Sequence, residues 1–370
     1  MRLHVVKRDS CPLWKMLLLY VGAVAAALLL GAVLLLALGV NPMEYYSKMF
    51  TMGMVGNKIA YKAFENYLKV FVPLVLTAVG LSLAFKMRFW NIGGEGQFIV
   101  GAIVAAVVAF KAGAVLPGAV TLLLMCLAAM AAAGAYGAIA AALKVRFGTN
   151  ETLLTLMLNY IALYLLQFLG ETKAGWNFFL DPDSARPKFA GFPDNADMIT
   201  FPLGPFNLNL SLIIAIVLCV LLFGYLKYTK HGYEIAVVGD SPNTARYAGM
   251  KVGRIVVRTI FLSAALIGLA GAFYVSSAGT LSTSVTNDVG WTGIVVAWLA
   301  KLNTVGIVIT ALLITVLQFG CQAASTTYSS IDANFADLIQ GIILFAVLAA
   351  DFFTRFRLAR RAAAPKEVSK

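Results

Sequence analysis

Apolar residues gather into ten runs along the chain, and short polar segments separate these runs. The runs cover residues 16–40, 70–85, 90–110, 115–143, 152–170, 209–226, 255–276, 289–300, 303–320 and 335–353. A helix needs about 20 mostly apolar residues to cross the hydrocarbon core of a bilayer, and most of the runs approach or exceed that length. The pattern therefore predicts an all-α polytopic membrane protein with about ten transmembrane helices in a single domain, 1–370.

The eighth run, 289–300, is too short to cross the bilayer fully. It contains Gly290 and Gly293 and stops at Lys301, so we expect a partial or broken helix packed inside protein. A glycine-rich segment also opens the third run. The third run is the second of runs two to five, and the eighth run is the second of runs seven to ten. These two sets of four runs are predicted to cross the membrane in opposite directions. The sequence thus predicts an inverted repeat, with one half at 70–170 and the other at 255–353.

Two longer polar segments lie between the runs. Five prolines and several acidic residues fall within 171–208, which predicts an irregular external loop. The segment 227–254 is polar and is predicted to be cytoplasmic. Within it, Ser241 suits a helix N-cap, Pro242 suits the first helical position and Gly249 suits the end. We therefore expect a short surface helix at 242–248.

Composition supports a membrane protein and argues against nucleic-acid binding. The chain is 61% hydrophobic and only 12% charged, whereas soluble domains carry about 25% charged residues. The net charge is +12, but the basic residues do not cluster with aromatic residues on a polar domain. Membrane proteins become basic because lysine and arginine collect in their cytoplasmic loops. We therefore expect contact with membrane lipid and none with nucleic acid.

The distribution of basic residues predicts the orientation. With ten spans and a cytoplasmic N-terminus, 21 of the 29 lysines and arginines fall on the cytoplasmic side and 8 on the outside. This asymmetry predicts that both termini are cytoplasmic. The first run, 16–40, exceeds the 7–15 apolar residues typical of a signal peptide, so we expect an uncleaved first span.

Motifs for catalysis or metal binding are missing from the sequence. The cysteines Cys11, Cys126, Cys219 and Cys321 have neither zinc-site nor disulfide spacing, and we expect them to be small apolar side chains. There is no G-x-x-x-x-G-K-[ST], H-E-x-x-H or G-x-S-x-G motif. We therefore predict no catalytic residue, no metal, and no ATPase site within this chain.

The most informative segment is 91–97, which reads Asn-Ile-Gly-Gly-Glu-Gly-Gln. Each glycine weakens a helix by about 1 kcal/mol relative to alanine. A charge at bilayer depth costs at least about 2.5 kcal/mol, so Glu95 should face a cavity or a partner. One interpretation is a structural ion pair with Lys86 or Arg88. The other is a flexible joint at the cytoplasmic mouth of a pathway.

Other polar and aromatic residues also have two interpretations. Asn159 and Gln167 lie near one face of their run, where they suit either a polar substrate or a neighbouring helix. Trp291 and Trp298 suit a membrane-interface belt, or rings that stack against a planar substrate. Asn303 follows the same short run.

Three segments together resemble the permease subunits of bacterial ABC importers. They are Phe-Trp-Asn-Ile-Gly-Gly-Glu-Gly-Gln at 89–97, the segment 231–250 ending in Gly-Asp-Ser-Pro-Asn-Thr-Ala-Arg-Tyr-Ala-Gly-Met, and the segment 290–303 beginning in Gly-Trp-Thr-Gly-Ile. The branch is that for branched-chain amino acids, ribose-type sugars and nucleosides. The form Trp-Asn-Ile-Gly is most similar to the nucleoside members.

This resemblance implies a function and a set of partners. The chain would pair with a second permease subunit of the same or a related kind, two cytoplasmic ATPase subunits that carry ATP and magnesium, and an extracytoplasmic substrate-binding protein. It would lie in the bacterial cytoplasmic membrane and move nucleosides inward. The resemblance also implies an ATPase-coupling loop made of Tyr233, Glu234, Asp240, Ser241, Pro242, Asn243, Arg246, Tyr247 and Gly249. Candidate residues of the pathway or its gate are Asn91, Gly93, Gly94, Glu95, Gln97, Asn159, Trp291, Trp298 and Asn303.

Alternatives remain open at this point. The same machinery would also suit simple sugars or branched-chain amino acids. An ion-coupled secondary transporter is compatible with an inverted repeat, and Glu95 or Asp337 would then bind a proton. A membrane scaffold without transport activity is the third class.

Overall fold

A computed structural model describes residues 3–7, 12–54, 60–325, 328, 331 and 334–360. Cys11 and the basic residues Arg2, Arg8, Lys58, Arg361, Lys366 and Lys370, which entered the predictions above, lie outside the described residues. The chain forms two compact units. One unit comprises residues 1–56 and 317–370, and the other comprises residues 57–316. The single domain predicted from the sequence, and its inverted repeat, stay predictions.

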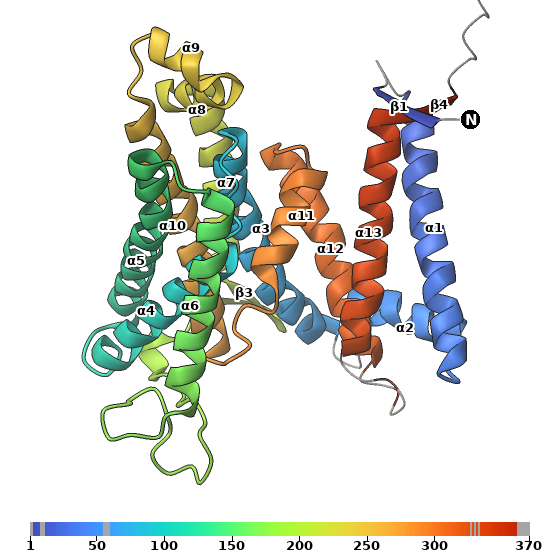
Figure 1. Cartoon of the computed structure of the whole chain (residues 1–370). Helices are drawn as coiled ribbons and strands as arrows, with labels where there is room; N and C mark the ends of the chain where they lie inside the picture. Colours follow the sequence, from blue (N-terminus) through green and yellow to red (C-terminus); the bar gives the residue numbers. More distant parts are fainter. Residues whose placement is uncertain are drawn as a thin grey trace, which may run out of the picture. The chain divides into compact units, whose positions relative to one another are not determined.

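The predicted all-α membrane architecture is confirmed (Figure 1). In the described part of the chain, nine helices are long and apolar enough to cross a membrane. They are α1 (Leu13–Ala37), α3 (Ala60–Lys86), α4 (Gly94–Ala112), α5 (Gly118–Phe147), α6 (Glu151–Glu171), α7 (Leu210–Tyr228), α10 (Val252–Ala278), α12 (Thr304–Ser325) and α13 (Asn334–Arg355).

The eighth predicted run forms α11 (Val289–Leu299), which has 11 residues. At 1.5 Å per residue it is roughly 16 Å long, about half the thickness of a hydrocarbon core. The expectation of a partial helix is therefore confirmed for this segment.

Several elements were not expected from the sequence. The helix α3 begins at Ala60, ten residues before its apolar run. Its first turns therefore contain polar residues that the apolar pattern did not predict as helix. The additional helices are α2 (Pro42–Met54) and α8 (Lys230–Asp240). Short strands form two antiparallel pairs, β1 (Leu3–Lys7) with β4 (Phe356–Arg360), and β2 (Thr200–Leu203) with β3 (Phe206–Asn209).

The first unit is built from α1, α2, the end of α12, α13 and the β1–β4 pair. Helix α1 packs against α13. The core contains Tyr45 and Met49 of α2 with Cys321 at the end of α12. The buried Tyr45 hydroxyl hydrogen-bonds the Ser325 hydroxyl at 3.1 Å, so the one polar atom of this side chain is satisfied. Cys321 is buried, as expected for a small apolar side chain.

The second unit is organised around α10, which packs against α3, α4 and α5. Small residues permit this close packing. A Cβ on Gly101 of α4 would collide with the backbone of Gly268 in α10. The hydroxyl of Ser263 in α10 donates to the carbonyl oxygen of Gly80 in α3 at 2.7 Å. Glycine contacts and hydroxyl-to-backbone bonds are typical of helices that associate within a membrane.

The connections of the second unit lie at two opposite ends (Figure 1). The loop after α6 lies at one end and contains the 3₁₀ turn η1 (Asp194–Ala196) and the β2–β3 hairpin. The helices α8 and α9 (Pro242–Tyr247) lie at the other. The loop predicted at 171–208 is mostly irregular but ends in this hairpin. The two longer polar segments therefore occupy opposite ends, as the predicted topology requires.

Candidate functional site

A non-helical connection joins α3 to α4, and two amide side chains stabilise it. Nδ2 of Asn91 donates to Oε1 of Gln97 at 3.1 Å, and Nε2 of Gln97 donates back to Oδ1 of Asn91 at 3.0 Å. Oδ1 of Asn91 also accepts from the backbone N–H of Gly93. Both amides are buried. These residues bond to each other, which fixes the start of α4.

Helix α6 contributes a second set of hydrogen bonds to the same segment. Oδ1 of Asn159 accepts from the backbone N–H of Gly96, and its Nδ2 donates to the carbonyl of Ile92, both at 2.8 Å. The hydroxyl of Thr155 accepts from the N–H of Ile92 at 3.2 Å. Of the two interpretations of Asn159, the structure shows contact with a neighbouring segment. Thr155 was not anticipated, although it lies one helical turn before Asn159.

Glu95 meets the start of α11. Its Oε1 accepts from the backbone N–H groups of Gly290 at 3.1 Å and Trp291 at 3.4 Å. A carboxylate is stabilised there because the first N–H groups of a helix lack partners and carry partial positive charge. The ion pairs found among the described residues do not include Glu95, so the structure does not show the pair with Lys86 or Arg88.

Glycine is required at position 290 of this meeting point, whereas a Cβ on Gly94 would make only an ordinary van der Waals contact. A Cβ on Gly290 would lie 2.5 Å from the backbone nitrogen of Glu95, and a Cβ on Gly94 would lie 3.4 Å from Cα of Gly290. The two glycine-interrupted segments predicted from the sequence are therefore in direct contact. We call this contact, made by residues 91–97 of the first segment, Asn159, and residues 290–291, the helix joint.

The backbone is strained at both ends of α11. Asn287 and Asp288 precede the helix with φ of 42° and 56°, and Lys301 and Leu302 follow it with φ of 51° and 58°. Non-glycine residues rarely adopt these left-handed conformations, which cost on the order of 1–3 kcal/mol each. Such strain is concentrated at switch regions and ligand clamps. The short helix α11 is thus bounded by two candidate hinges.

An aromatic cluster lies between the α3–α4 connection and the end of α11. Trp90 and Trp298 stack with ring centroids 5.3 Å apart and 19° between planes. Phe85 contacts both rings at 6.0 and 5.5 Å. Trp90 is 48% exposed, which leaves part of its ring free for another planar group. Sequence reasoning had selected Trp298 but neither Trp90 nor Phe85, although Trp90 lies inside the signature segment.

The remaining residues of the predicted pathway lie apart from these contacts. The side chain of Trp291 is exposed, and only its backbone reaches Glu95. Asn303 caps α12, since its Oδ1 accepts from the N–H of Val305 at 3.0 Å. An N-cap explains Asn303 at this position without a ligand.

The predicted coupling helix forms almost as expected. Helix α9 begins at Pro242, and the Ser241 hydroxyl caps it by accepting from the N–H of Thr244 at 3.3 Å. Gly249 follows with a φ of 77°, a conformation that favours glycine. The preceding helix α8 was not predicted. The Thr229 hydroxyl caps it by accepting from the N–H of Gly232.

Helices α8 and α9 are anchored to the spans on one side only. Ile235, Val238 and Ala245 join a buried cluster with the end of α3 and the start of α10. Glu234 forms a 2.8 Å ion pair with Arg258 of α10, so this predicted coupling residue bonds within the chain. The other side is exposed, and Tyr233 and Tyr247 protrude from it. The remaining exposed members of the predicted set are Asp240, Pro242, Asn243, Arg246 and Gly249, of which Pro242 and Arg246 line a cavity toward the spans and are not counted in this surface. We call this exposed side of α8 and α9 the docking surface.

Comparison with known proteins gives a family and a set of relatives. A family model described as the branched-chain amino acid transport system permease component matches residues 63–348. The chain is 30% identical over 329 residues to the nucleoside ABC transporter permease protein NupB of Lactococcus lactis, covering 88% of each chain. It is 29% identical over 366 residues to the glucose ABC transporter permease protein TsgB13 of Haloferax volcanii, covering 96% of this chain and 93% of the relative.

A third relative is the guanosine ABC transporter permease protein NupP of Bacillus subtilis. The two sequences are 28% identical over 341 residues, covering 90% of this chain and 93% of the relative. No solved structure matches the chain. The family match spans the helix joint, the aromatic cluster and the docking surface, and the relatives are covered almost from end to end. The chain belongs to the family of branched-chain amino acid transport system permease components.

Proposed function

We propose that this chain is the membrane-spanning subunit of an ATP-driven importer that moves nucleosides inward across a bacterial cytoplasmic membrane. Membership of the permease family supports the transport role. Two of the relatives carry names of nucleoside and guanosine transporters. Nucleosides are polar and uncharged and carry a planar base, which suits a path with amides and an exposed indole. Simple sugars are the second candidate, favoured by the glucose permease that matches 96% of this chain. The branched-chain amino acids in the family's description are the third.

The proposed assembly contains this chain, a second permease subunit of the same or a related kind, two cytoplasmic ATPase subunits and an external binding protein. ATP and magnesium belong to the ATPase subunits, and this chain contributes no catalytic residue. The excess of basic residues on one side supports an orientation with both termini in the cytoplasm. In that orientation α8 and α9 face the cytoplasm.

The observation that carries the coupling role is the exposure of Tyr247. Its side chain is 93% exposed at the end of a short, capped helix that packs firmly on its opposite side. A tyrosine presented in this way is a typical anchor for a protein interface, because it offers a large rigid surface at low entropic cost. We propose that α9 inserts into the ATPase subunit and passes its movement to the neighbouring helix α8, whose Glu234 transmits it to α10 through the ion pair with Arg258.

The helix joint is the proposed gate. Glu95 bonds the start of α11, and α11 has strained residues at both ends. A movement of α11 that breaks these two hydrogen bonds would separate the starts of α4 and α11. The same movement would separate Trp298 from Trp90 and uncover the indole rings. The joint and the aromatic cluster would thus open together.

The test is uptake by vesicles that contain the permease with its ATPase and binding protein. We expect ATP-dependent uptake of labelled guanosine or uridine, and little uptake of labelled glucose or leucine. Glucose uptake without nucleoside uptake would transfer the proposal to sugars. Vesicles without the ATPase are the control. Uptake in those vesicles, driven by a proton or sodium gradient, would contradict an ATP-driven importer.

A further inference from the structure

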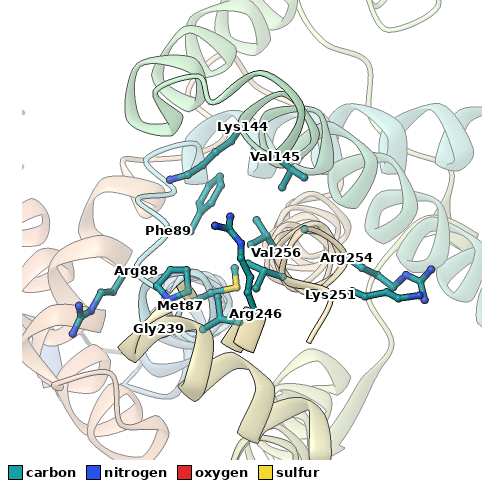
Figure 2. Close-up of a pocket in the computed structure, with 14 residues that line it drawn as sticks. Met87, Arg88, Phe89, Lys144, Val145, Gly239, Arg246, Lys251, Arg254 and Val256 are labelled. Carbon is teal, nitrogen blue, oxygen red and sulfur yellow. The ribbon is translucent and has the colours of Figure 1, made fainter. Parts of the chain in front are cut away.

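A cavity of about 680 Å³ lies where α3 and α5 end and α10 begins, and α8 and α9 form its remaining walls (Figure 2). Five of its lining residues are basic, and none of the lining residues is acidic. The basic residues are Arg88, Lys144, Arg246, Lys251 and Arg254. They come from four separate segments, so the fold itself collects this positive charge.

Most of this charge has no counter-charge in the described part of the chain. Lys144 forms an ion pair with Glu151, but Arg88, Arg246, Lys251 and Arg254 have no carboxylate within 4.0 Å. The nearest polar partner of Arg246 is Oδ1 of Asn243 at 3.5 Å, a weak contact. Figure 2 shows Arg246 pointing into the cavity, whereas Arg88 on one side and Lys251 and Arg254 on the other extend outward at its rim. Positive charge without a counter-ion around a cavity favours the binding of an anion.

The cavity has a polar part and an apolar part. Figure 2 shows that the guanidinium group of Arg246 points into the space between Phe89 and Val256. The Lys144 amine lies over the Phe89 ring, 5.2 Å from the ring centroid. Met87 and Val145 also line the cavity. A ligand here would contact cations and apolar side chains at once.

The location identifies the class of ligand. The spans α3 and α5 end at Lys86 and Phe147, and α10 starts at Val252, so the cavity opens at the boundary between membrane and water. Basic pockets between helices at this boundary bind anionic lipid head groups. A guanidinium group can donate two parallel hydrogen bonds to the oxygens of a phosphate. The apolar wall suits the part of an acyl chain that lies next to the glycerol.

We propose that this cavity binds the phosphate head group of an anionic phospholipid such as phosphatidylglycerol. Arg246 holds the phosphate, and the basic side chains at the rim of the cavity add favourable charge. Val145 and Val256, which are both accessible, contact the acyl end. The site itself does not rest on the proposed function. Because Pro242 and Arg246 of α9 line the cavity, a bound lipid would also fix α9 against α5 and α10, and this consequence does rest on the docking role of α9.

The experiment measures equilibrium binding of a fluorescent phosphatidylglycerol to the purified full-length chain in detergent. Unlabelled phosphatidylglycerol, phosphatidylcholine, glycerol phosphate and inorganic phosphate serve as competitors. The cavity variant is Arg246→Gln/Arg254→Gln. The matched control is Lys227→Gln/Lys230→Gln, which removes two charges from exposed residues outside the cavity. A basic residue near the surface adds about 1 kcal/mol to anionic-lipid binding, so we expect a loss of about 10- to 30-fold in the cavity variant.

The outcomes separate the possible ligands. The lipid site is supported if only the cavity variant loses affinity for phosphatidylglycerol, and if phosphatidylcholine and inorganic phosphate compete weakly. An equal loss of lipid affinity in both variants overturns the proposal, because binding then depends only on the overall charge of the protein. Competition by inorganic phosphate as strong as that of the lipid assigns the site to a free phosphate. A cavity variant that binds lipid normally but no longer retains the ATPase overturns the lipid proposal and leaves the docking role in place.

Discussion

The helix joint and the docking surface use polar residues in opposite ways. At the joint, Asn91, Gln97 and Asn159 are buried, and their amides bond to each other or to the backbone. On the docking surface, Asn243 and Tyr247 face away from the protein, and only weak local contacts involve them. Apart from Asn159, the residues of both regions belong to segments that resemble the permease family, so family signatures alone do not distinguish their roles.

The difference separates two kinds of mutational effect. A buried polar group that loses its partner is expensive, whereas an exposed side chain contributes little to folding. Substitutions at the joint should therefore reduce the stability of the protein before they reveal a transport role. Substitutions on the docking surface should leave stability unchanged and affect only the function that depends on a partner.

The largest effect is expected for Asn159→Leu. The substitution leaves the N–H of Gly96 buried without a partner, at a cost of roughly 1–3 kcal/mol, and removes the bond to the half-buried carbonyl of Ile92. Thermal unfolding in detergent micelles should show a large decrease in Tm. Gln167→Leu in the same helix is the matched control, because Gln167 is only half-buried and makes none of these bonds. Equal decreases in the two variants would contradict the role of Asn159.

The next largest effect is expected for Gly290→Ala. The added methyl group would lie 2.5 Å from the backbone nitrogen of Glu95, so α4 and α11 must separate. Overpacking of this kind costs about 1–3 kcal/mol. Gly224→Ala in α7 is the control, since nothing lies within 4 Å of its added Cβ and alanine favours helix. We expect a lower Tm for the first variant and an unchanged or higher Tm for the second. An unchanged Tm in Gly290→Ala would show that the contact is loose.

The positions of the helices could be predicted from the sequence because each helix depends on a continuous stretch of apolar residues. The bilayer requires long apolar runs, and each of the ten runs corresponds to a helix near its expected position. The start of α9 could also be predicted from nearby residues, because the Ser241 cap and Pro242 act on the backbone beside them. Helix α8 was missed because it has only 11 residues and its apolar run, 235–238, is only four residues long. The start of α3 at Ala60 was missed because a helix continues beyond the apolar core into polar sequence.

The contacts of the candidate site were not predictable in the same way. Glu95 and Gly290 are 195 positions apart, and Trp90 and Trp298 belong to different halves of the chain. The glycine patterns indicated two interrupted helices, but no local rule states that their starts meet. Lys86 and Arg88 were plausible partners of Glu95 because they are close in sequence. The helix start supplies the same favourable charge from a distant segment.

A smaller effect is expected at the Glu234–Arg258 ion pair, which joins α8 to α10. The pair is partly buried, so breaking it should cost about 1–2 kcal/mol, between the values for surface and buried pairs. Glu234→Gln, Arg258→Gln and the double variant form a double-mutant cycle, measured by thermal unfolding. If the pair stabilises the protein, the double variant will lose less stability than the sum of the two single losses. Additive losses would contradict a direct interaction.

The smallest effect on stability is expected for Tyr247→Asp, and it gives the sharpest test of the comparison. Because the side chain is 93% exposed, the free energy of unfolding should change by less than about 0.5 kcal/mol. ATP-driven uptake should nevertheless fall severely, because a charge replaces the proposed anchor at the ATPase. Tyr228→Asp is the matched control, because Tyr228 is a tyrosine with 74% exposure at the end of α7 and lies outside α8 and α9.

Three measurements on Tyr247→Asp decide its role: Tm, retention of the ATPase during purification, and ATP hydrolysis per molecule transported. A normal Tm with weak ATPase retention, or with hydrolysis that no longer drives uptake, places Tyr247 at the interface between subunits. Normal uptake in this variant would remove α9 from the coupling route. The exposed tyrosine would then have no assigned partner, and the Glu234–Arg258 pair would be only a structural link between α8 and α10.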